Sequence, residues 1–222
     1  MKLNMPLTVT VLEPTASNFP IALRDREGTS TFPRFWAIGD LAILEKHLLG
    51  FFCSTRCPGE VILRTYDLAR ALRDARVPVI SGFHSSMEKE CLDLLLRGTQ
   101  PVVVCPARNL ERMRIPNKWK APLAEGRLLI LSPFTGKTRR ATAGLAQKRN
   151  EFVAALAEKV FVAHAAQGSK TERFCYDVLT WGKPLLTLEG DENAGLLVLG
   201  AKPVWPKNVS EWWATATSSC TV

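Results

Sequence analysis

The sequence lacks any long apolar run. No stretch of its 222 residues reaches the roughly 18 uninterrupted apolar residues of a membrane-spanning helix. The first residues also lack the apolar segment of a secretory signal, so we expect no membrane segment and a cytoplasmic location. Six cysteines are scattered along the chain, and Cys53 and Cys57 have no second pair at a metal-ligand spacing. We therefore expect reduced thiols and no bound metal.

Several catalytic motifs are also missing. No Gly-x-Gly-x-x-Gly follows the first predicted strand, and no Gly-x-Ser-x-Gly occurs. The segment 135–138, Thr-Gly-Lys-Thr, ends like a P-loop but lacks the required earlier glycine. No pair of carboxylates is placed for acid–base work. These absences disfavour dinucleotide binding and nucleotide hydrolysis, predict no cofactor, and favour a binding protein over an enzyme.

Basic residues, in contrast, are abundant. The chain has 29 Lys and Arg against 21 Asp and Glu, which gives a net charge of +8. Some of them are clustered: Arg108, Arg112 and Arg114; Lys137, Arg139 and Arg140; Lys148 and Arg149. A basic surface attracts polyanions without specifying which one, so nucleic acid and a merely solvated surface both remain open.

The central stretch of the sequence runs from residue 48 to residue 72. Residues 48–53 form a short apolar run of strand length, and residues 54–59 are small, polar and turn-forming. From Val61 the apolar residues recur at helical spacing. A strand, a small-residue loop and a helix point backbone amides at the strand end, which suits a phosphate, and Arg56 adds a planar cation.

The same alternation of strand and helix continues along the chain. We expect further strands over 77–80, 101–105, 128–131, 160–163 and 184–188, and helices from 87 to 97, 140 to 158 and 171 to 181. Residues 32–40 are aromatic and turn-rich and are expected to pack along the sheet edge. This rhythm predicts an α/β, Rossmann-like, doubly wound and mainly parallel sheet with helices on both faces. We divide the chain into an N-terminal arm or edge segment (1–31), the main domain (32–203) and a tail (204–222).

Polar loops follow the predicted strands and should meet at one rim, because ligands of such sheets bind at the carboxyl ends of the strands. Phe83 or Phe134 offers a stacking face for a base. The candidate phosphate-binding residues are Ser54, Thr55, Arg56, Ser81, Gly82, His84, Lys148, Arg149, Asn150, Gly168, Ser169 and Lys170.

An ordered set of motifs over about residues 32–203 resembles the DNA-processing protein A family (DprA/Smf). Residues 54–56 resemble its Gly-Ser-Arg loop, 79–82 its Val-x-Ser-Gly strand end, and 107–110 its Asn-containing segment. Residues 148–150 are similar to its Arg-Arg-Asn-Arg helix, and 193–196 to its Asn-x-Leu. Two departures are Cys53 in place of the loop's opening Gly and His164 in place of a carboxylate. The chain is thus similar to a short, divergent member with only the Rossmann-like core.

The resemblance implies that the protein binds single-stranded DNA through a basic pocket, in DNA uptake and recombination. It implies that Arg56 grips a phosphate while Ser54 and Thr55 shape the loop, and that residues 148–150 extend the basic surface. It also implies a partner of the RecA recombinase type and a homodimer.

An enzymatic interpretation stays open beside this one. LOG-type phosphoribohydrolases use a related fold with a Pro-Gly-Gly-x-Gly-Thr-x-x-Glu loop, of which residues 168–172 carry a fragment. Glu172 is then a candidate acid, although a glutamate in the first turn of a helix also stabilises the helix dipole. A nucleotide-binding sensor or LOG-like phosphoribohydrolase is therefore the alternative function.

Overall fold

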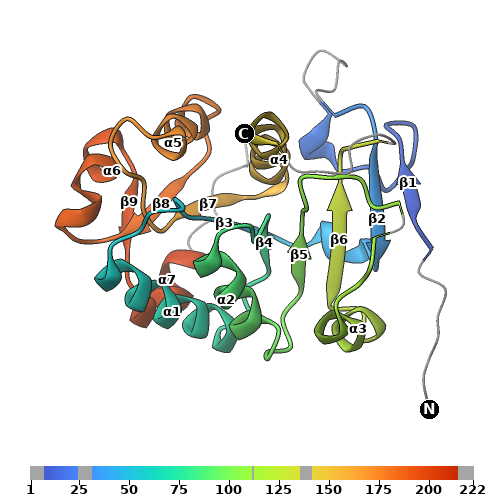
Figure 1. Ribbon diagram of the computed structural model, residues 1–222, viewed down its shortest axis with the longest axis horizontal. Helices are drawn as coiled ribbons and strands as arrows, with labels where there is room; N and C mark the ends of the chain where they lie inside the picture. Colours follow the sequence, from blue (N-terminus) through green and yellow to red (C-terminus); the bar gives the residue numbers. More distant parts are fainter. Residues whose placement is uncertain (1–7, 25–31, 112, 136–141, 215–222) are drawn as a thin grey trace.

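The computed structural model describes residues 8–24, 32–111, 113–135 and 142–214. Within these residues, nine strands form one sheet in the order β1-β2-β6-β5-β4-β3-β7-β8-β9 (Figure 1). All neighbours pair in parallel except β1 with β2 and β2 with β6. The strands are β1 Thr10–Leu12, β2 Phe35–Gly39, β3 Leu49–Phe52, β4 Val79–Ser81, β5 Val102–Val104, β6 Leu128–Ser132, β7 Lys159–Val162, β8 Leu185–Leu188 and β9 Lys202–Val204.

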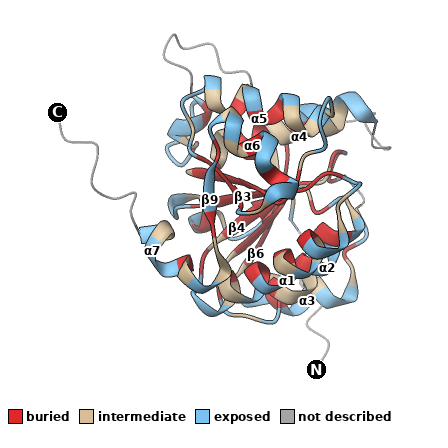
Figure 2. Cartoon of the chain, turned by 90° about the vertical axis from the view of Figure 1, so that its left-hand side faces the viewer, coloured by how far each residue is buried: buried red, intermediate tan, exposed pale blue. Residues whose placement is uncertain are grey.

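Helices cover both faces of this sheet (Figures 1 and 2). One face carries α1 Gly59–Asp74, α2 Ser86–Leu95, α3 Asn117–Ala124 and α7 Val209–Ala214. The other carries α4 Ala143–Leu156, α5 Lys170–Thr180 and α6 Ala194–Leu199. Short 3-10 helices are η1 Ile21–Leu23, η2 Leu41–Glu45, η3 Asp191–Asn193 and η4 Pro206–Asn208. Every helix in the described part of the chain is too short or too polar to cross a lipid bilayer.

The side chains of the central strands alternate between two apolar layers. In β3, Leu49 and Phe51 pack with α1 and α2, whereas Phe52 packs in the layer that contains α4 and α5. In β7, Phe161 belongs to the first layer and Val160 to the second. Strands buried on both faces read as continuous apolar runs, which is why the sequence revealed them.

The predicted fold class is confirmed, and all six strands predicted in the apolar runs are present. Of the other three, β1 lies in the segment expected as an N-terminal arm or edge segment, and β2 and β9 were not predicted as strands. The segment 32–40 was expected only to pack at the edge, but β2 lies inside the sheet, between β1 and β6. Strand β9 forms the opposite edge beside β8.

The ends of the chain contact the same sheet. Strand β1, from the N-terminal arm, pairs with β2, and Val204 and Val209 of the C-terminal tail are buried in the layer beneath α1. Lys159 Nζ donates hydrogen bonds to the carbonyls of Trp212 and Trp213, at 2.6 and 3.1 Å. The described part of the tail thus packs against the main domain, and the proposed division of the chain stays a prediction.

The order of the strands reverses at β3. The chain proceeds from β3 outward through β4, β5 and β6, and then β7 returns to the other side of β3. Helices that follow β3 and β7 therefore leave toward opposite faces, and the carboxyl ends of these strands are the topological switch point.

Candidate functional site at the strand ends

Glu88 joins the loops that follow β3 and β4. It is buried in the first turn of α2, where it forms a capping box with Ser85. Its Oε1 accepts a hydrogen bond of 3.0 Å from the Cys53 amide, and its Oε2 accepts the amides of His84 and Ser85, at 2.7 and 3.0 Å. A single carboxylate thus fixes two loops that lie 35 residues apart in the sequence.

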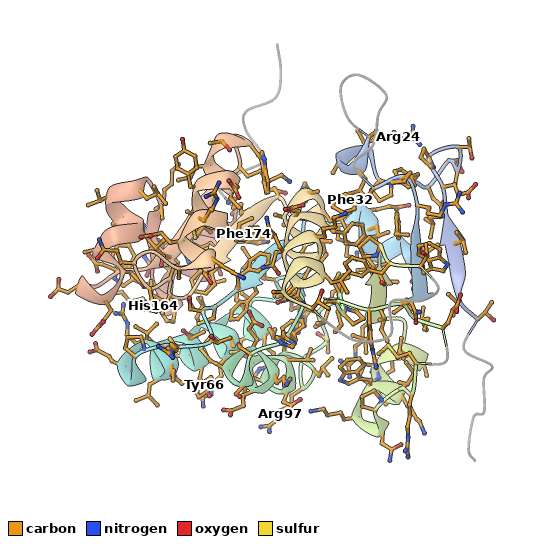
Figure 3. The ribbon with its side chains drawn as sticks, turned by 45° about the horizontal axis from the view of Figure 1, so that its top comes forward. Arg24, Phe32, Tyr66, Arg97, His164 and Phe174 are labelled. Carbon is orange, nitrogen blue, oxygen red and sulfur yellow. The ribbon has the colours of Figure 1, made fainter. Side chains whose placement is uncertain are left out.

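The loops after β3, β7 and β8 are joined in a similar way. The Ser54 amide donates to the His164 carbonyl at 3.0 Å, and His164 Nδ1 lies 3.1 Å from Asn193 Oδ1. Asn193 Nδ2 donates to the carbonyls of Ala163 and Leu188, both at 3.0 Å. His164, labelled in Figure 3, is buried and serves this network, which brings the expected strand-end loops to one rim.

Arg149 extends from α4 to the ends of β4 and β5. Its Nη1 donates to the Cys105 carbonyl at 3.1 Å and its Nε to Asn150 Oδ1 at 2.8 Å. Only 5% of the residue is exposed, and its guanidinium covers the backbone of Gly82. Burial lowers the pKa of the Arg149 guanidinium below its usual value, and the Glu88 carboxylate offsets part of this effect. A buried cation of this kind is favoured by a nearby anion.

A cavity of about 420 Å³ opens beside this guanidinium, and we call it the strand-end pocket. Its walls combine cations with apolar side chains, and no carboxylate is among its lining residues. The backbone of Phe83 turns here with a φ of 45°, which is uncommon for a side chain of this size. The lining residues are Gly82, Phe83, His84, Lys89, Leu92, Val104, Pro106, Ala107, Arg108, Met113, Lys118, Trp119 and Arg149.

The consecutive residues Lys148, Arg149 and Asn150 face different directions, because successive residues of an α-helix are about 100° apart around its axis. Lys148 is exposed to solvent, and Arg149 faces the sheet. Asn150 lines a groove of about 540 Å³ between α4 and α5, together with Lys170. The motif therefore supplies one buried cation, one exposed cation and one polar side chain at a separate groove.

Gly168 and Ser169 lie at the start of α5, in a cavity of about 520 Å³ that also contacts Leu199 of α6. Glu172, in the first turn of α5, takes part in the cap of this helix. Its Oε2 accepts the Gly168 amide at 2.7 Å, and its own amide donates to Ser169 Oγ at 3.1 Å. Gly168 has a φ of 69°, so the loop needs a residue that tolerates the left-handed region.

The remaining candidates are partly internal. Ser81 is fully buried, and its Oγ accepts the Phe83 amide at 3.2 Å, so it shapes the turn that precedes His84. Ser54 is buried, whereas Thr55 and Arg56 are exposed. Phe83 and Phe134 were expected to offer a stacking face, but both side chains are buried.

The structure therefore divides the twelve candidates instead of placing them in one cavity. Gly82, His84 and Arg149 share the strand-end pocket, and none of the three cavities contains residues 54–56 or Lys148 among its lining residues. Arg112 and residues 136–141, which include part of the basic clusters and of the P-loop-like segment, lie outside the described residues.

Sequence reasoning missed the joining role of Glu88 and the pocket walls formed by Met113 and Trp119. The Ser-x-x-Glu spacing of a capping box, with Ser85 and Glu88, was the available indication for the first. Nothing in the local sequence indicated that Trp119 would line the same cavity as Gly82, since the two come from separate strand–helix connections. In the described residues, no group of three or more His, Cys, Asp or Glu side chains is placed to hold a metal ion.

Comparisons with known proteins agree with this architecture. A family model described as DNA recombination-mediator protein A matches residues 10–195. DNA processing protein A (DprA) from Streptococcus pneumoniae gives a TM-score of 0.74 at 17% identity, covering 90% of this chain and 73% of that one. DprA from Helicobacter pylori, solved for its single-stranded DNA binding mode, gives 0.73 at 19% identity, covering 94% and 97%.

More distant folds are also similar. The molybdenum cofactor binding protein from Rippkaea orientalis gives a TM-score of 0.54 at 12% identity, covering 77% of this chain and 96% of that one. A search of curated proteins found no significant match. At these identities the solved structures establish the fold alone.

Proposed function

This chain belongs to the DNA recombination-mediator protein A family, because the family model matches residues 10–195, and from this premise we propose that it binds single-stranded DNA along the strand-end rim. The resemblance to DprA is confirmed by the family model and by the fold of two DprA structures. One of them is described by its binding of single-stranded DNA. That binding mode is extended here to this chain as a proposal.

The observation that carries the proposal is the buried guanidinium of Arg149 beside an open pocket. Arginine has five N–H donors, and protein acceptors in the described residues engage its Nη1 and Nε. Burial makes its charge costly, and a phosphate oxygen would relieve that cost with a charge-assisted hydrogen bond. The absence of carboxylates from the lining residues removes the main source of repulsion toward such an anion.

Other cations surround the pocket and suit a chain of phosphates. Lys89, Arg108 and Lys118 line it, although Lys118 Nζ also pairs with Asp93 at 2.5 Å. The exposed side chains of Arg56 and Lys148 extend the positive surface beyond it. Contacts of this kind position a nucleic acid without reading its sequence. The apolar walls, including Met113 and Trp119, suit a base next to the bound phosphate.

The hydrolase alternative has weaker support. Its candidate acid, Glu172, accepts the Gly168 amide and caps α5, and it lines a different cavity from Arg149. A nucleotide sensor remains distinguishable by experiment, because a pocket of about 420 Å³ also suits a mononucleotide.

A titration with labelled oligo-dT at several salt concentrations tests the proposal. We expect binding at low salt, with an affinity that falls with a log–log slope of about −0.7 for each phosphate neutralised. An oligonucleotide that stays free at low salt, while AMP raises the melting temperature, would overturn the proposal in favour of the nucleotide sensor.

Two partner assignments belong to the same proposal. A homodimer is supported by exposed apolar side chains on α5 and α6, where Tyr176 is 58% and Val198 is 89% exposed. Light scattering after gel filtration tests it, and a monomeric mass at high protein concentration would contradict it.

A RecA-type recombinase is tested by co-purification of RecA with the DNA-bound protein.

A further inference from the structure

The loop after β3 begins and ends with a cysteine. Cys53 is buried and Cys57 is half-buried, and both pack in the apolar layer that contains α1 and α2. The two thiols lie close enough that each affects the pKa of the other. Between them lie Ser54, Thr55 and Arg56, so a bond between the two sulfur atoms would close a small ring around this basic loop.

The two thiols differ in reactivity. The contact with Cys53 lowers the pKa of the Cys57 thiol, against the opposing effects of burial and of Glu192. The same contact and burial raise the pKa of Cys53. Cys57 lies just before Pro58, the N-cap of the 16-residue helix α1, where the helix dipole favours a negative charge. Because thiolates are the nucleophiles in cysteine chemistry, Cys57 is the attacking residue of the pair.

The other described cysteines are poor competitors. Burial raises the pKa of the Cys91, Cys105 and Cys175 thiols to about 12 in each case. All three are fully buried, so a dissolved oxidant reaches them less readily than it reaches the half-buried Cys57. In the structure all five described cysteines are free thiols.

We propose that Cys53 and Cys57 are a site of reversible oxidation, at which hydrogen peroxide closes an intramolecular disulfide around the Ser54-Thr55-Arg56 loop. The Cys57 thiolate attacks one peroxide oxygen, the O–O bond breaks, and hydroxide leaves, which produces a sulfenic acid on Cys57. The Cys53 sulfur then attacks the Cys57 sulfur and expels the sulfenic oxygen, which takes up the Cys53 proton and leaves as water. Two thiols and one peroxide thus give one disulfide and two water molecules.

Hydrogen bonds hold one end of the loop in place while the other end moves to form the disulfide. The amides of Cys53 and Ser54 are held by Glu88 and by the His164 carbonyl, which fixes the first half of the loop. Closure therefore requires movement of Cys57 toward a stationary Cys53. The two residues are only four positions apart, so the movement involves a short segment. The proposal stands apart from DNA binding, since it depends only on the two thiols and their surroundings.

Peptide mapping of the full-length protein tests the proposal. After peroxide treatment, remaining thiols are alkylated and the chain is cut with trypsin, which cleaves after Lys46, Arg56 and Arg64 and so separates the two cysteines. We expect peptides 47–56 and 57–64 to be linked, with a mass two hydrogen atoms below their sum. A thiol reductant should release them with both cysteines available to alkylation.

Two variants complete the experiment. Cys57→Ser should abolish the linked peptides, and Cys91→Ser, a change in the same apolar layer, should retain them. Folding of each variant is checked by circular dichroism, and the wild-type result is decisive if Cys57→Ser does not fold. The proposal is overturned if peroxide leaves both Cys53 and Cys57 open to alkylation, or if either becomes linked to Cys91 instead.

Discussion

The guanidinium of Arg149 covers Gly82 so closely that a Cβ atom on residue 82 would lie 1.4 Å from Nη1 and 1.9 Å from Cζ. The glycine in the loop that follows β4 thus leaves the space that an arginine of α4 occupies. This contact determines where the buried cation points, because Arg149 is also fastened to the Cys105 carbonyl and to Asn150.

Substitution of Gly82 by alanine should displace Arg149 without removing it. We expect Gly82→Ala to lower the free energy of unfolding by about 1–3 kcal/mol, the usual cost of overpacking, and to weaken oligo-dT binding. Urea denaturation and fluorescence anisotropy measure the two effects. Gly59→Ala is the matched control, because nothing lies within 4 Å of a Cβ at residue 59. Equal behaviour of the two variants would contradict the role assigned to this contact.

Buried and exposed cations of α4 should contribute differently to binding. Arg149→Lys keeps the charge but loses the planar fork, so we expect a loss of about tenfold in affinity, equivalent to about 1.4 kcal/mol. Lys148→Ala should weaken binding of every sequence modestly and reduce the salt slope by about 0.7. Titrations at several salt concentrations separate the two patterns. A larger loss in Lys148→Ala than in Arg149→Lys would place the main contact on the exposed face.

Glu88 should be important for stability and not only for binding. Its carboxylate accepts three amide hydrogen bonds, and Glu88→Gln replaces one acceptor oxygen with a donor that faces an N–H group. We expect a loss of about 2–3 kcal/mol in the free energy of unfolding, because hydrogen bonds to charged groups are strong and unsatisfied buried donors are costly. Glu60→Gln, an exposed change in the first turn of α1, should lose less than about 1 kcal/mol. Similar losses in the free energy of unfolding of the two variants would show that Glu88 does not hold the two loops together.

The fold was largely predictable from the sequence, because parallel strands such as β5 and β7 are buried on both faces and therefore form continuous apolar runs. Strand β9 was not predicted from the sequence, for the opposite reason. It is an edge strand with exposed Lys202 and Pro203, and proline is tolerated in sheets mainly at such edges. Strand β2 was not predicted because its segment, 32–40, is rich in aromatic and turn-forming residues.

The site was predictable only in part. The loops after β3, β4 and β7 lie at the ends of parallel strands, but sequence cannot show the direction in which each side chain points. Ser81 follows the strand pleat into the interior, and Arg149 is the one member of its motif that faces the sheet. The pocket walls combine residues from separate connections, so only the three-dimensional structure brings them together.

Lys183 should make stability depend on pH. Burial lowers the pKa of its amine from 10.5 to about 8, with a partial offset from Glu158. Between these two values the unfolded chain binds more protons than the folded one, so the free energy of unfolding should rise as the pH increases through this range. Urea denaturation at several pH values measures the slope, which should be flatter in Lys183→Met.

The Lys183→Met variant should also differ from the wild type in its overall stability, because it removes both the buried charge and the hydrogen bonds that Nζ donates to the carbonyls of Ala155 and Ala157 at 2.8 and 2.5 Å. The slope, not the overall level, is therefore the test. Lys207→Met changes an exposed lysine and should keep the wild-type slope. If Lys183→Met retains that slope as well, another group is responsible for the dependence.

Oxidation of the Cys53–Cys57 pair should reduce DNA affinity through Arg56. The first half of the loop is held by Glu88 and His164, so closure of the disulfide moves Cys57 and the adjacent Arg56 toward the interior. We expect oxidised protein to bind oligo-dT more weakly than reduced protein, by no more than the loss caused by Arg56→Ala. Anisotropy titrations with and without a thiol reductant measure the difference.

The decisive comparison combines the two changes. If the disulfide acts by moving Arg56, then oxidation of an Arg56→Ala variant should change its DNA affinity much less than oxidation of the wild type, because the affected contact is already absent. Cys57→Ser should be insensitive to peroxide and should bind as the reduced wild type does. An equal loss upon oxidation with and without Arg56 would show that the disulfide acts on another part of the rim, and the link between this loop and phosphate binding would have to be abandoned.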